Sequence, residues 1–298
     1  MINGILNVYK EKGYTSHDVV ARLRGIVKQK KIGHTGTLDP EAEGVLPVCL
    51  GKGTKLCELL TDKRKTYRTV MLLGTVTDTQ DTTGTILEEK EVTVTESQVR
   101  EAVLSFLGDY DQVPPMYSAL KVDGKKLYEY AREGKVIERA ARKVVIYDIE
   151  IEWIQLPKVS MKVTCSKGTY IRTLCHDIGE TLGCGACMNS LLRTQVSCFS
   201  LEESHRLADI ERMQEEGTLK QVLMPMDAVF EEYPKVKVNA DGEKFLRNGN
   251  PLNLNSLQFV QESENGNKIR VYGVDGEFCA VYEYRAARKQ YFPVKMFL

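Results

Sequence analysis

The sequence predicts an α+β protein, with a large mixed-sheet domain over residues 1–232 and a small β-rich domain over residues 233–298. Segments with strand alternation and segments with helical spacing follow one another without a fixed repeat. The C-terminal segment contains four short strand-like stretches separated by turn residues. A chain of 298 residues, 42% hydrophobic and 28% charged, is long enough to bury the cores of both domains.

The first part of the large domain is expected to begin with a strand and continue into a helix. Residues 1–9 have strand character and lead to a turn at Gly13. Thr15-Ser16-His17-Asp18 is typical of a helix start, and apolar residues at helical spacing follow it. Three further elements are expected: a buried strand over Val45–Leu50, a helix over Thr54–Leu60 and a strand over Tyr67–Leu73 that ends at Gly74.

The middle of the chain is expected to hold an inserted segment. A capping box, Thr95-Glu96-Ser97-Gln98, opens a helix through Phe106. Residues 109–142 are interpreted as a loop and helix over the main body, because Pro114-Pro115 blocks regular structure and Asp123-Gly124 marks a tight turn. The remaining elements are a helix over Lys125–Glu133 capped by Gly134, a hairpin of Lys143–Gln155 and Val159–Cys165, helices over Gly168–Leu182 and within Glu202–Glu216, a linker over Glu231–Pro234, and strands over Leu257–Gln261, Lys268–Val274, Phe278–Tyr284 and Tyr291–Phe297.

The composition predicts a cytoplasmic protein without a membrane span. No stretch approaches the roughly 18 consecutive apolar residues that a transmembrane helix needs. The first residues lack the basic and apolar regions of a secretory signal. Eight cysteines in such a chain are expected to be free thiols in a reducing compartment.

Charge is balanced overall but unevenly distributed. The chain has 41 basic and 41 acidic side chains, yet residues 1–80 hold 13 basic against 8 acidic and residues 112–145 hold 8 against 4. Residues 201–234 reverse this, with 3 basic against 9 acidic. Phosphate binding depends on the local field, so a nucleic acid stays a candidate partner. Each basic run on its own also suits an ordinary solvated face.

The residues that most suggest chemistry lie between Gly33 and Gly51. Two glycines surround a histidine and a threonine there, and the backbone of such a loop can approach a ligand closely. Asp39 precedes Pro40, which disfavours helical geometry at Asp39 and holds its carboxylate at a defined place. The same residues suit a common helix opening, with Asp39 as N-cap and Pro40 as the first helical residue. The residues alone leave both interpretations open.

Four motifs occur in order along the chain. They are Gly33-His34-Thr35-Gly36-Thr37-Leu38-Asp39-Pro40 with Gly44-Val45-Leu46-Pro47 and Gly51, then Lys65–Arg68 with Thr77–Gly84, then Val113–Lys121, and last Cys165–Leu174. Together they resemble the motifs of the TruB family, the tRNA pseudouridine synthases that convert the T-loop uridine at position 55. The resemblance covers residue 3 to about residue 198. One segment departs from the family pattern, since Lys10-Glu11-Lys12-Gly13 lacks the usual proline after the first lysine.

This resemblance implies a pseudouridine synthase domain with a thumb inserted near residues 109–142 and a PUA-like RNA-binding domain at the C-terminal end. It implies that Asp39 acts on the sugar, either as a nucleophile at C1′ or as a base at C2′. Arg172 is implied to pair with Asp39, and Tyr67 to stack on the uracil and help remove its C5 proton. The implied substrate contacts are His34, which fills the space of the flipped base, Tyr170 and Leu191, which line the base pocket, and Lys10 and Lys121.

No metal or cofactor is expected. Gly51-Lys52-Gly53-Thr54 is not a phosphate loop, because Leu46 stands where that motif needs a glycine. Cys184 and Cys187 have metal-ligand spacing, but no second pair matches them.

The expected partner is tRNA, contacted through its T-arm, with the acceptor stem as a further contact of the C-terminal domain, and the protein is expected to be a monomer. Two alternatives are a non-catalytic RNA-binding or RNA-folding protein on the same scaffold and a relative that works within a guide-RNA complex. The intact Asp39, Tyr67 and Arg172 argue against a pure binder.

Overall fold

The computed structural model describes residues 1–258 and 264–298, and most of its strands belong to one large mixed sheet. The strand order is β14–β1–β3–β12–β4–β11–β10–β7, with β2 added to β3 and β13 to β12. β12 runs parallel to β3 and antiparallel to β4. The bounds are β1 Gly4–Lys10, β2 Ile32–His34, β3 Glu43–Leu50, β4 Lys65–Leu73, β7 Gly108–Gln112, β10 Arg142–Gln155, β11 Lys158–Cys165, β12 Ala186–Val196, β13 Phe199–Ser200 and β14 Leu223–Met224.

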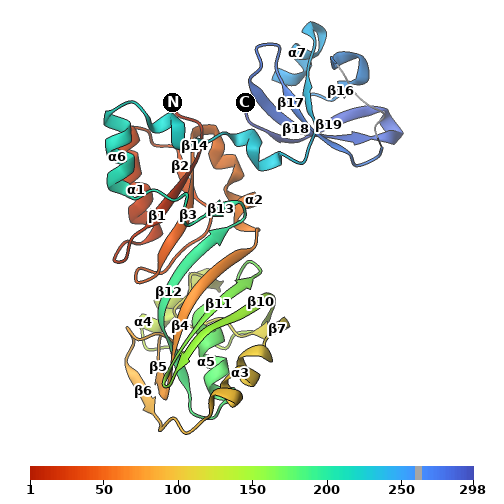
Figure 1. Ribbon diagram of the computed structural model, residues 1–298. Helices are drawn as coiled ribbons and strands as arrows, with labels where there is room; N and C mark the ends of the chain where they lie inside the picture. The colour runs from red at the N-terminus through yellow and green to blue at the C-terminus, as the bar shows by residue number, and fades with distance from the viewer. Residues whose placement is uncertain (259–263) are drawn as a thin grey trace.

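Two pairs of helices cover two halves of this sheet. α1 (Ser16–Val27) and α6 (Leu207–Glu215) pack on β1 and β3, whereas α3 (Glu96–Leu104) and α5 (Ile171–Thr181) pack near β4, β10 and β11. β4 and β12 run from one half into the other, which gives the molecule its elongated shape (Figure 1). The helix expected after Thr15 is confirmed, since Thr15 and Asp18 form a capping box. No helix in the described part of the chain is long and apolar enough to cross a membrane.

Several expected elements have different bounds in the structure. The helix expected over Thr54–Leu60 is a 3₁₀ helix, η1 (Gly51–Leu56), followed by the short α2 (Cys57–Thr61). A side chain at Gly53 would lie 2.7 Å from the Gly4 carbonyl oxygen, so η1 rests directly on β1. The helix expected over Gly168–Leu182 begins at Ile171, and the helix expected within Glu202–Glu216 is α6, over Leu207–Glu215. Further short elements are β5 Thr75–Thr77, β6 Ile86–Glu89, η2 Leu219–Val222 and η3 Met226–Phe230.

The sequence analysis missed β12, which lies at the centre of the sheet. Its residues do not alternate cleanly, because the polar Asn189 and Ser190 and the charged Arg193 interrupt the apolar positions. The pairing with β4 shifts register twice, between Met188 and Ser190 and between Arg193 and Gln195. Such irregularities disrupt the period of two by which a strand is recognised.

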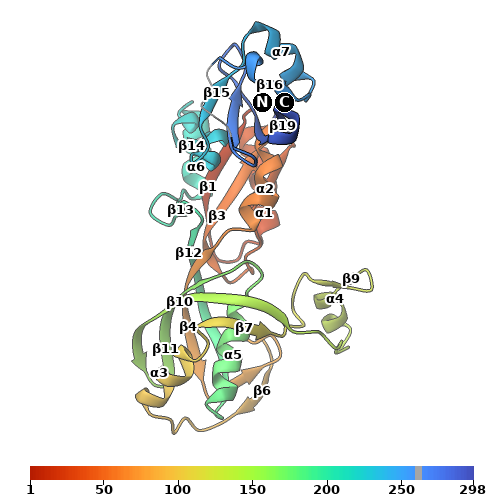
Figure 2. The same cartoon turned by 90° about the vertical axis from the view of Figure 1, so that its right-hand side faces the viewer.

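The inserted segment is shorter than expected. Residues 108–112 form β7, which pairs with the start of β10, so the excursion covers residues 113–141. It holds a small hairpin of β8 (Lys121–Val122) and β9 (Lys125–Lys126), and then α4 (Leu127–Arg132). Asp123 and Gly124 both have positive φ, as a tight two-residue hairpin turn requires. This excursion, called the thumb from here on, projects away from the sheet (Figure 2).

The C-terminal segment forms a separate five-stranded sheet of order β15–β17–β18–β19–β16, with helix α7 (Ala240–Arg247) beside it. Its strands are β15 Lys235–Lys237, β16 Leu252–Asn253, β17 Lys268–Tyr272, β18 Phe278–Arg285 and β19 Gln290–Met296, with η4 Leu254–Ser256 and η5 Ala286–Arg288 between them. Three of the expected strands are therefore confirmed. The fourth, Leu257–Gln261, falls largely outside the described residues, and Leu257 itself forms only an isolated bridge with Val238. Aromatic residues of this domain, Phe278 and Phe297, share a core with the large domain.

Candidate active site

Asp39 lies in a turn between β2 and β3, and no helix follows it. The Ala42 N–H donates to the Asp39 carbonyl oxygen at 3.1 Å, and β3 starts at Glu43. The alternative in which Asp39 caps a helix is therefore wrong. The Ser16 hydroxyl accepts from the Leu38 N–H at 2.9 Å, which ties the turn to the start of α1.

Arg172, the second residue of α5, points at this turn. Its Nε lies 3.0 Å from Asp39 Oδ2, and the Arg172 side chain is 6% exposed while that of Asp39 is 42% exposed. The other two guanidinium nitrogens donate to the carbonyl oxygens of Thr79 at 2.9 Å and Tyr117 at 2.8 Å. Asp81 adds a second carboxylate, with its Oδ2 3.6 Å from Nη1. A planar guanidinium held on all sides presents one edge to Asp39 in a fixed direction.

Asp39 and Arg172 form part of the wall of a cavity of about 690 Å³. Tyr67 from β4, Tyr170 at the start of α5 and Leu191 from β12 also line it. Burial raises the pKa of both tyrosines. The cavity is electropositive, since among the described residues its charged lining consists of one carboxylate, Asp39, and six cations: Lys65, Arg142, Lys143, Lys167, Arg172 and Arg193.

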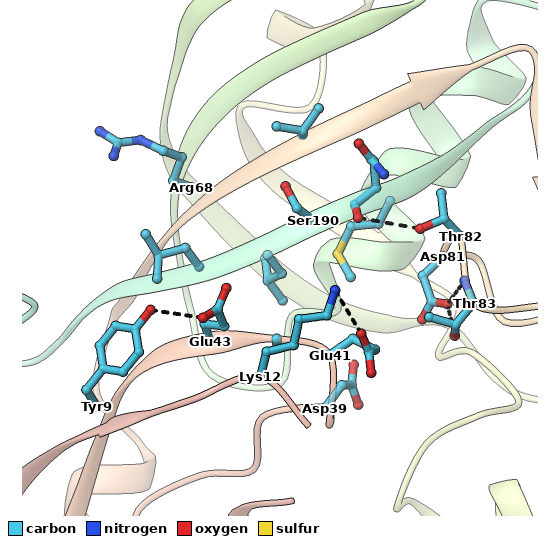
Figure 3. Close-up of a pocket in the computed structure, with 16 residues that line it drawn as sticks. Tyr9, Lys12, Asp39, Glu41, Glu43, Arg68, Asp81, Thr82, Thr83 and Ser190 are labelled. Atoms are coloured by element: carbon cyan, nitrogen blue, oxygen red, sulfur yellow. Dashed lines mark hydrogen bonds and ion pairs between the residues drawn. The ribbon is translucent and has the colours of Figure 1, made fainter. Parts of the chain in front are cut away.

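A second cavity of about 330 Å³ lies on the other side of Asp39 and Leu191, which line both cavities. Its charged lining is mostly acidic, and Figure 3 shows Glu41 bonded to Lys12 and Glu43 bonded to Tyr9. Asp39 therefore stands at the boundary between a basic cavity and an acidic one. A polyanionic substrate is attracted to the first and repelled by the second.

Three residues expected to contact substrate do not line either cavity. Lys10 is 0% exposed, and its Nζ donates to the carbonyl oxygens of Glu11, Tyr14 and Pro40 at 3.1, 2.6 and 3.1 Å. Its three donors are used within the protein, so Lys10 fixes the turn after Asp39 and does not reach a substrate. Burial lowers its pKa to about 8.

The other two residues lie outside the cavity for different reasons. His34 is partly buried at the end of β2, where its Nδ1 accepts from the Gly36 N–H at 3.3 Å. Burial, followed by the charge of Arg193, lowers the His34 pKa, which favours the neutral ring. Lys121 is exposed in the β8–β9 hairpin of the thumb.

The sequence analysis assigned no role to three charged residues that the structure brings to the site. Asp81 and Lys65 lie within the motifs that it recognised, and Arg193 follows Leu191 by two positions. Lys65 is buried with its Nζ bonded to the carbonyl oxygens of Thr61 and Lys63. A charge directly after the apolar pair Leu191-Leu192 was the only indication that the sequence offered for Arg193.

Comparison with known proteins places this site in a family. A model of the N-terminal domain of the TruB family of pseudouridylate synthases matches residues 24–171, and a model of the C-terminal domain of tRNA pseudouridylate synthase B matches residues 172–231. The chain belongs to the TruB family of pseudouridylate synthases. It is therefore an isomerase with the pseudouridine synthase fold, as the four ordered motifs predicted.

Individual relatives agree with this assignment. A tRNA pseudouridine synthase B of Lachnoclostridium phytofermentans is 57% identical over the full length of both chains, and one of Alkaliphilus oremlandii is 50% identical over 91% of this chain and 90% of its own. Among solved structures, a Cbf5–Nop10–Gar1 complex contains a chain with 27% identity and a TM-score of 0.73, matched over 99% of this chain and 85% of that one. An H/ACA ribonucleoprotein bound to a substrate RNA has a similar chain, with 25% identity, a TM-score of 0.72 and the same coverage.

Proposed function

We propose that this TruB-family chain converts a uridine of tRNA, the T-loop uridine at position 55, to pseudouridine. The observation that carries the proposal is the Asp39–Arg172 ion pair in the wall of a cavity whose other charges are all positive. Relatives up to 57% identical over their whole length are named tRNA pseudouridine synthase B. The guide-RNA alternative has less support, because the chains from such complexes are 25–27% identical.

The reaction is an isomerisation in which the bond between C1′ and N1 breaks and a bond between C1′ and C5 forms. The uracil turns within the cavity, C5 loses its proton and N1 gains one, so no oxidant or cofactor is consumed. Asp39 acts on the sugar, as a nucleophile at C1′ or as a base at C2′. Arg172 orients the Asp39 carboxylate during either step, since its position is fixed by Thr79 and Tyr117.

The base must leave its stack to reach this cavity, at a cost of about a few kcal/mol. Tyr67 stacks on the uracil and helps to remove the C5 proton, while Tyr170 and Leu191 bound the pocket. His34, which lies outside the cavity, takes the place of the flipped base within the tRNA. The exposed cations of the lining, Arg142, Lys143 and Lys167, attract the phosphates on either side of the target nucleotide.

The division into a catalytic domain over residues 1–232 and a PUA-like domain over residues 233–298 belongs to the same proposal. The thumb, with Lys121, contacts the T-arm, and the C-terminal domain contacts the acceptor stem. The same proposal has the protein acting as a monomer in the cytoplasm.

Mapping of pseudouridine on an unmodified tRNA transcript tests this function. The purified protein and an Asp39→Asn variant are incubated with the transcript, and tRNA binding is measured for both. We expect one new pseudouridine in the T-loop with the wild-type protein, none with the variant, and similar binding by both. Tight binding without any product from the wild-type protein would instead favour the RNA-folding alternative.

A further inference from the structure

Arg193 is a buried cation that the proposed chemistry does not use. It is 1% exposed, in the last third of β12, and its guanidinium forms no ion pair with a carboxylate within residues 1–258 and 264–298. Burial lowers its pKa, because the charged form is deprived of water. A buried charge without a counter-ion is strongly unfavourable unless hydrogen bonds compensate it. Its contacts must therefore be specific.

The first contacts of Arg193 are with the segment that carries Asp39. Its Nε donates to the Val45 carbonyl oxygen at 2.7 Å, and its Nη2 donates to the Gly36 carbonyl oxygen at 3.2 Å. Gly36 precedes Asp39 and Val45 follows it, so one guanidinium holds both ends of the turn. The fit at Gly44 is close as well, since a Cβ there would lie 2.2 Å from the Arg193 carbonyl oxygen.

The other contact of Arg193 is with Tyr67. The two residues are direct cross-strand partners on β12 and β4, and both side chains line the larger cavity. Burial raises the Tyr67 pKa, and the positive charge of Arg193 opposes that rise. Arg193 thus bonds to the turn that carries Asp39 and stands beside Tyr67, the two residues to which the proposed mechanism assigns the sugar and base chemistry.

We propose that Arg193 is a positioning residue of this active site, which fixes the Asp39 turn against β12 and orients the Tyr67 hydroxyl toward the uracil. This role rests on the proposed function. It differs from a purely architectural role in one measurable way. Loss of an architectural contact lowers stability and rate without regard to protonation, whereas loss of the charge beside Tyr67 changes how the rate depends on pH.

Two variants separate the two contacts. Arg193→Lys keeps the positive charge but replaces the planar guanidinium, whose Nε and Nη2 reach Val45 and Gly36 separately, with a single nitrogen. Arg193→Met removes the charge and the hydrogen bonds together. Arg212→Met is the matched control, because Arg212 is an exposed arginine of α6 that bonds only to Asp209 among the described residues.

The experiment measures single-turnover pseudouridine formation on the tRNA transcript between pH 6.5 and 9.5, together with tRNA affinity. We expect affinity to stay within about threefold for all variants, since Arg193 is buried. Displacement of the turn by about 1 Å costs about 100-fold in rate for Arg193→Met. The rate of Arg193→Lys falls by about tenfold, because part of the hydrogen bonding to the turn is kept. The rate of Arg193→Met reaches its maximum at a higher pH than the rate of the wild type, because the Tyr67 phenol ionises less readily without the positive charge. Arg193→Lys keeps the wild-type pH dependence.

Full activity of Arg193→Lys would overturn the positioning of the turn, and an unshifted pH dependence in Arg193→Met would overturn the contact with Tyr67. If Arg193→Met does not fold, Arg193→Lys still decides the first point, and Arg193→Gln, which is uncharged but polar, decides the second. A wild-type protein that forms no pseudouridine would overturn the proposed function, and this role of Arg193 with it.

Discussion

Replacing Arg172 with lysine is the sharpest test of how the site is held together. The Arg172 guanidinium makes hydrogen bonds in three directions, to Asp39, Thr79 and Tyr117. A lysine at this position has a single nitrogen on a shorter side chain and lacks the planar fork that reaches all three acceptors. The stability of the variant depends mainly on the lost hydrogen bonds to the two carbonyl oxygens. The ion pair with Asp39 counts for less, because Asp39 is 42% exposed and water can replace its partner.

The expected loss of stability follows from these contacts. A hydrogen bond from a charged donor contributes about 1.5–3 kcal/mol, so losing two at the lower value costs about 3 kcal/mol. One kcal/mol shifts the melting temperature of a protein of about 150–250 residues by about 2–4 °C, and that of a longer chain by less, because the entropy of unfolding grows with chain length. We therefore expect Arg172→Lys to melt about 5 °C below the wild type. The rate should fall by at least about 100-fold, because the Asp39 carboxylate is no longer directed at the sugar.

Thermal denaturation and single-turnover pseudouridine formation measure the two effects. Arg68→Lys is the control for stability, since Arg68 is 52% exposed and bonds to Glu152, so its replacement is expected to cost less than about 1 kcal/mol. If Arg172→Lys has the same melting temperature as Arg68→Lys and keeps the wild-type rate, the inference that the fixed guanidinium orients Asp39 is refuted.

Two further predictions concern the base and the thumb. Tyr67→Phe should fold and bind tRNA normally but lose at least about 100-fold in single-turnover rate, because the hydroxyl is proposed to help remove the C5 proton; a normal rate would exclude that role. Replacing both Lys125 and Lys126 with alanine should weaken tRNA binding. The slope of log Kd against the logarithm of the salt concentration should fall by about one to two. An unchanged slope in a filter-binding titration would show that the thumb is not part of the contact surface.

Local patterns predicted the elements that local forces determine. The capping boxes at Thr15 and Thr95 both formed, because each satisfies backbone N–H groups within a single turn of helix. The hairpin of β10 and β11 also formed where the alternation of apolar residues indicated it. β12 depends on partners that are distant in sequence, β3 and β4, and its two register shifts follow from those partners. A sequence read along one strand does not contain that information.

The site was predictable to a similar degree. The motif around Asp39 is contiguous and could be recognised, and the resemblance extended it to Tyr67 and Arg172. The burial of Lys10 and Arg193 is a tertiary property, which no short stretch of sequence reveals. Lys10 was expected at the substrate and instead holds the Pro40 carbonyl oxygen. At the position where the proline is missing, Glu11 forms an ion pair with Arg206 at 2.7 Å.

The balanced net charge is compatible with an RNA substrate because opposite charges occupy different places. The acidic segment after residue 200 includes α6, which packs beside α1, where Glu211 pairs with Arg22 at 2.8 Å (Figure 1). The carboxylates of α6 lie in the half of the sheet covered by α1 and α6, and no described carboxylate of residues 201–234 lines the larger cavity. Around the cavity Asp39 is the only carboxylate in the lining, and two of the cations, Lys65 and Arg193, are buried without an acidic partner in the described part of the chain. Burying such cations lowers stability, and natural proteins accept that cost mainly at functional sites. The local excess of positive charge is therefore itself an argument that this cavity receives a polyanion.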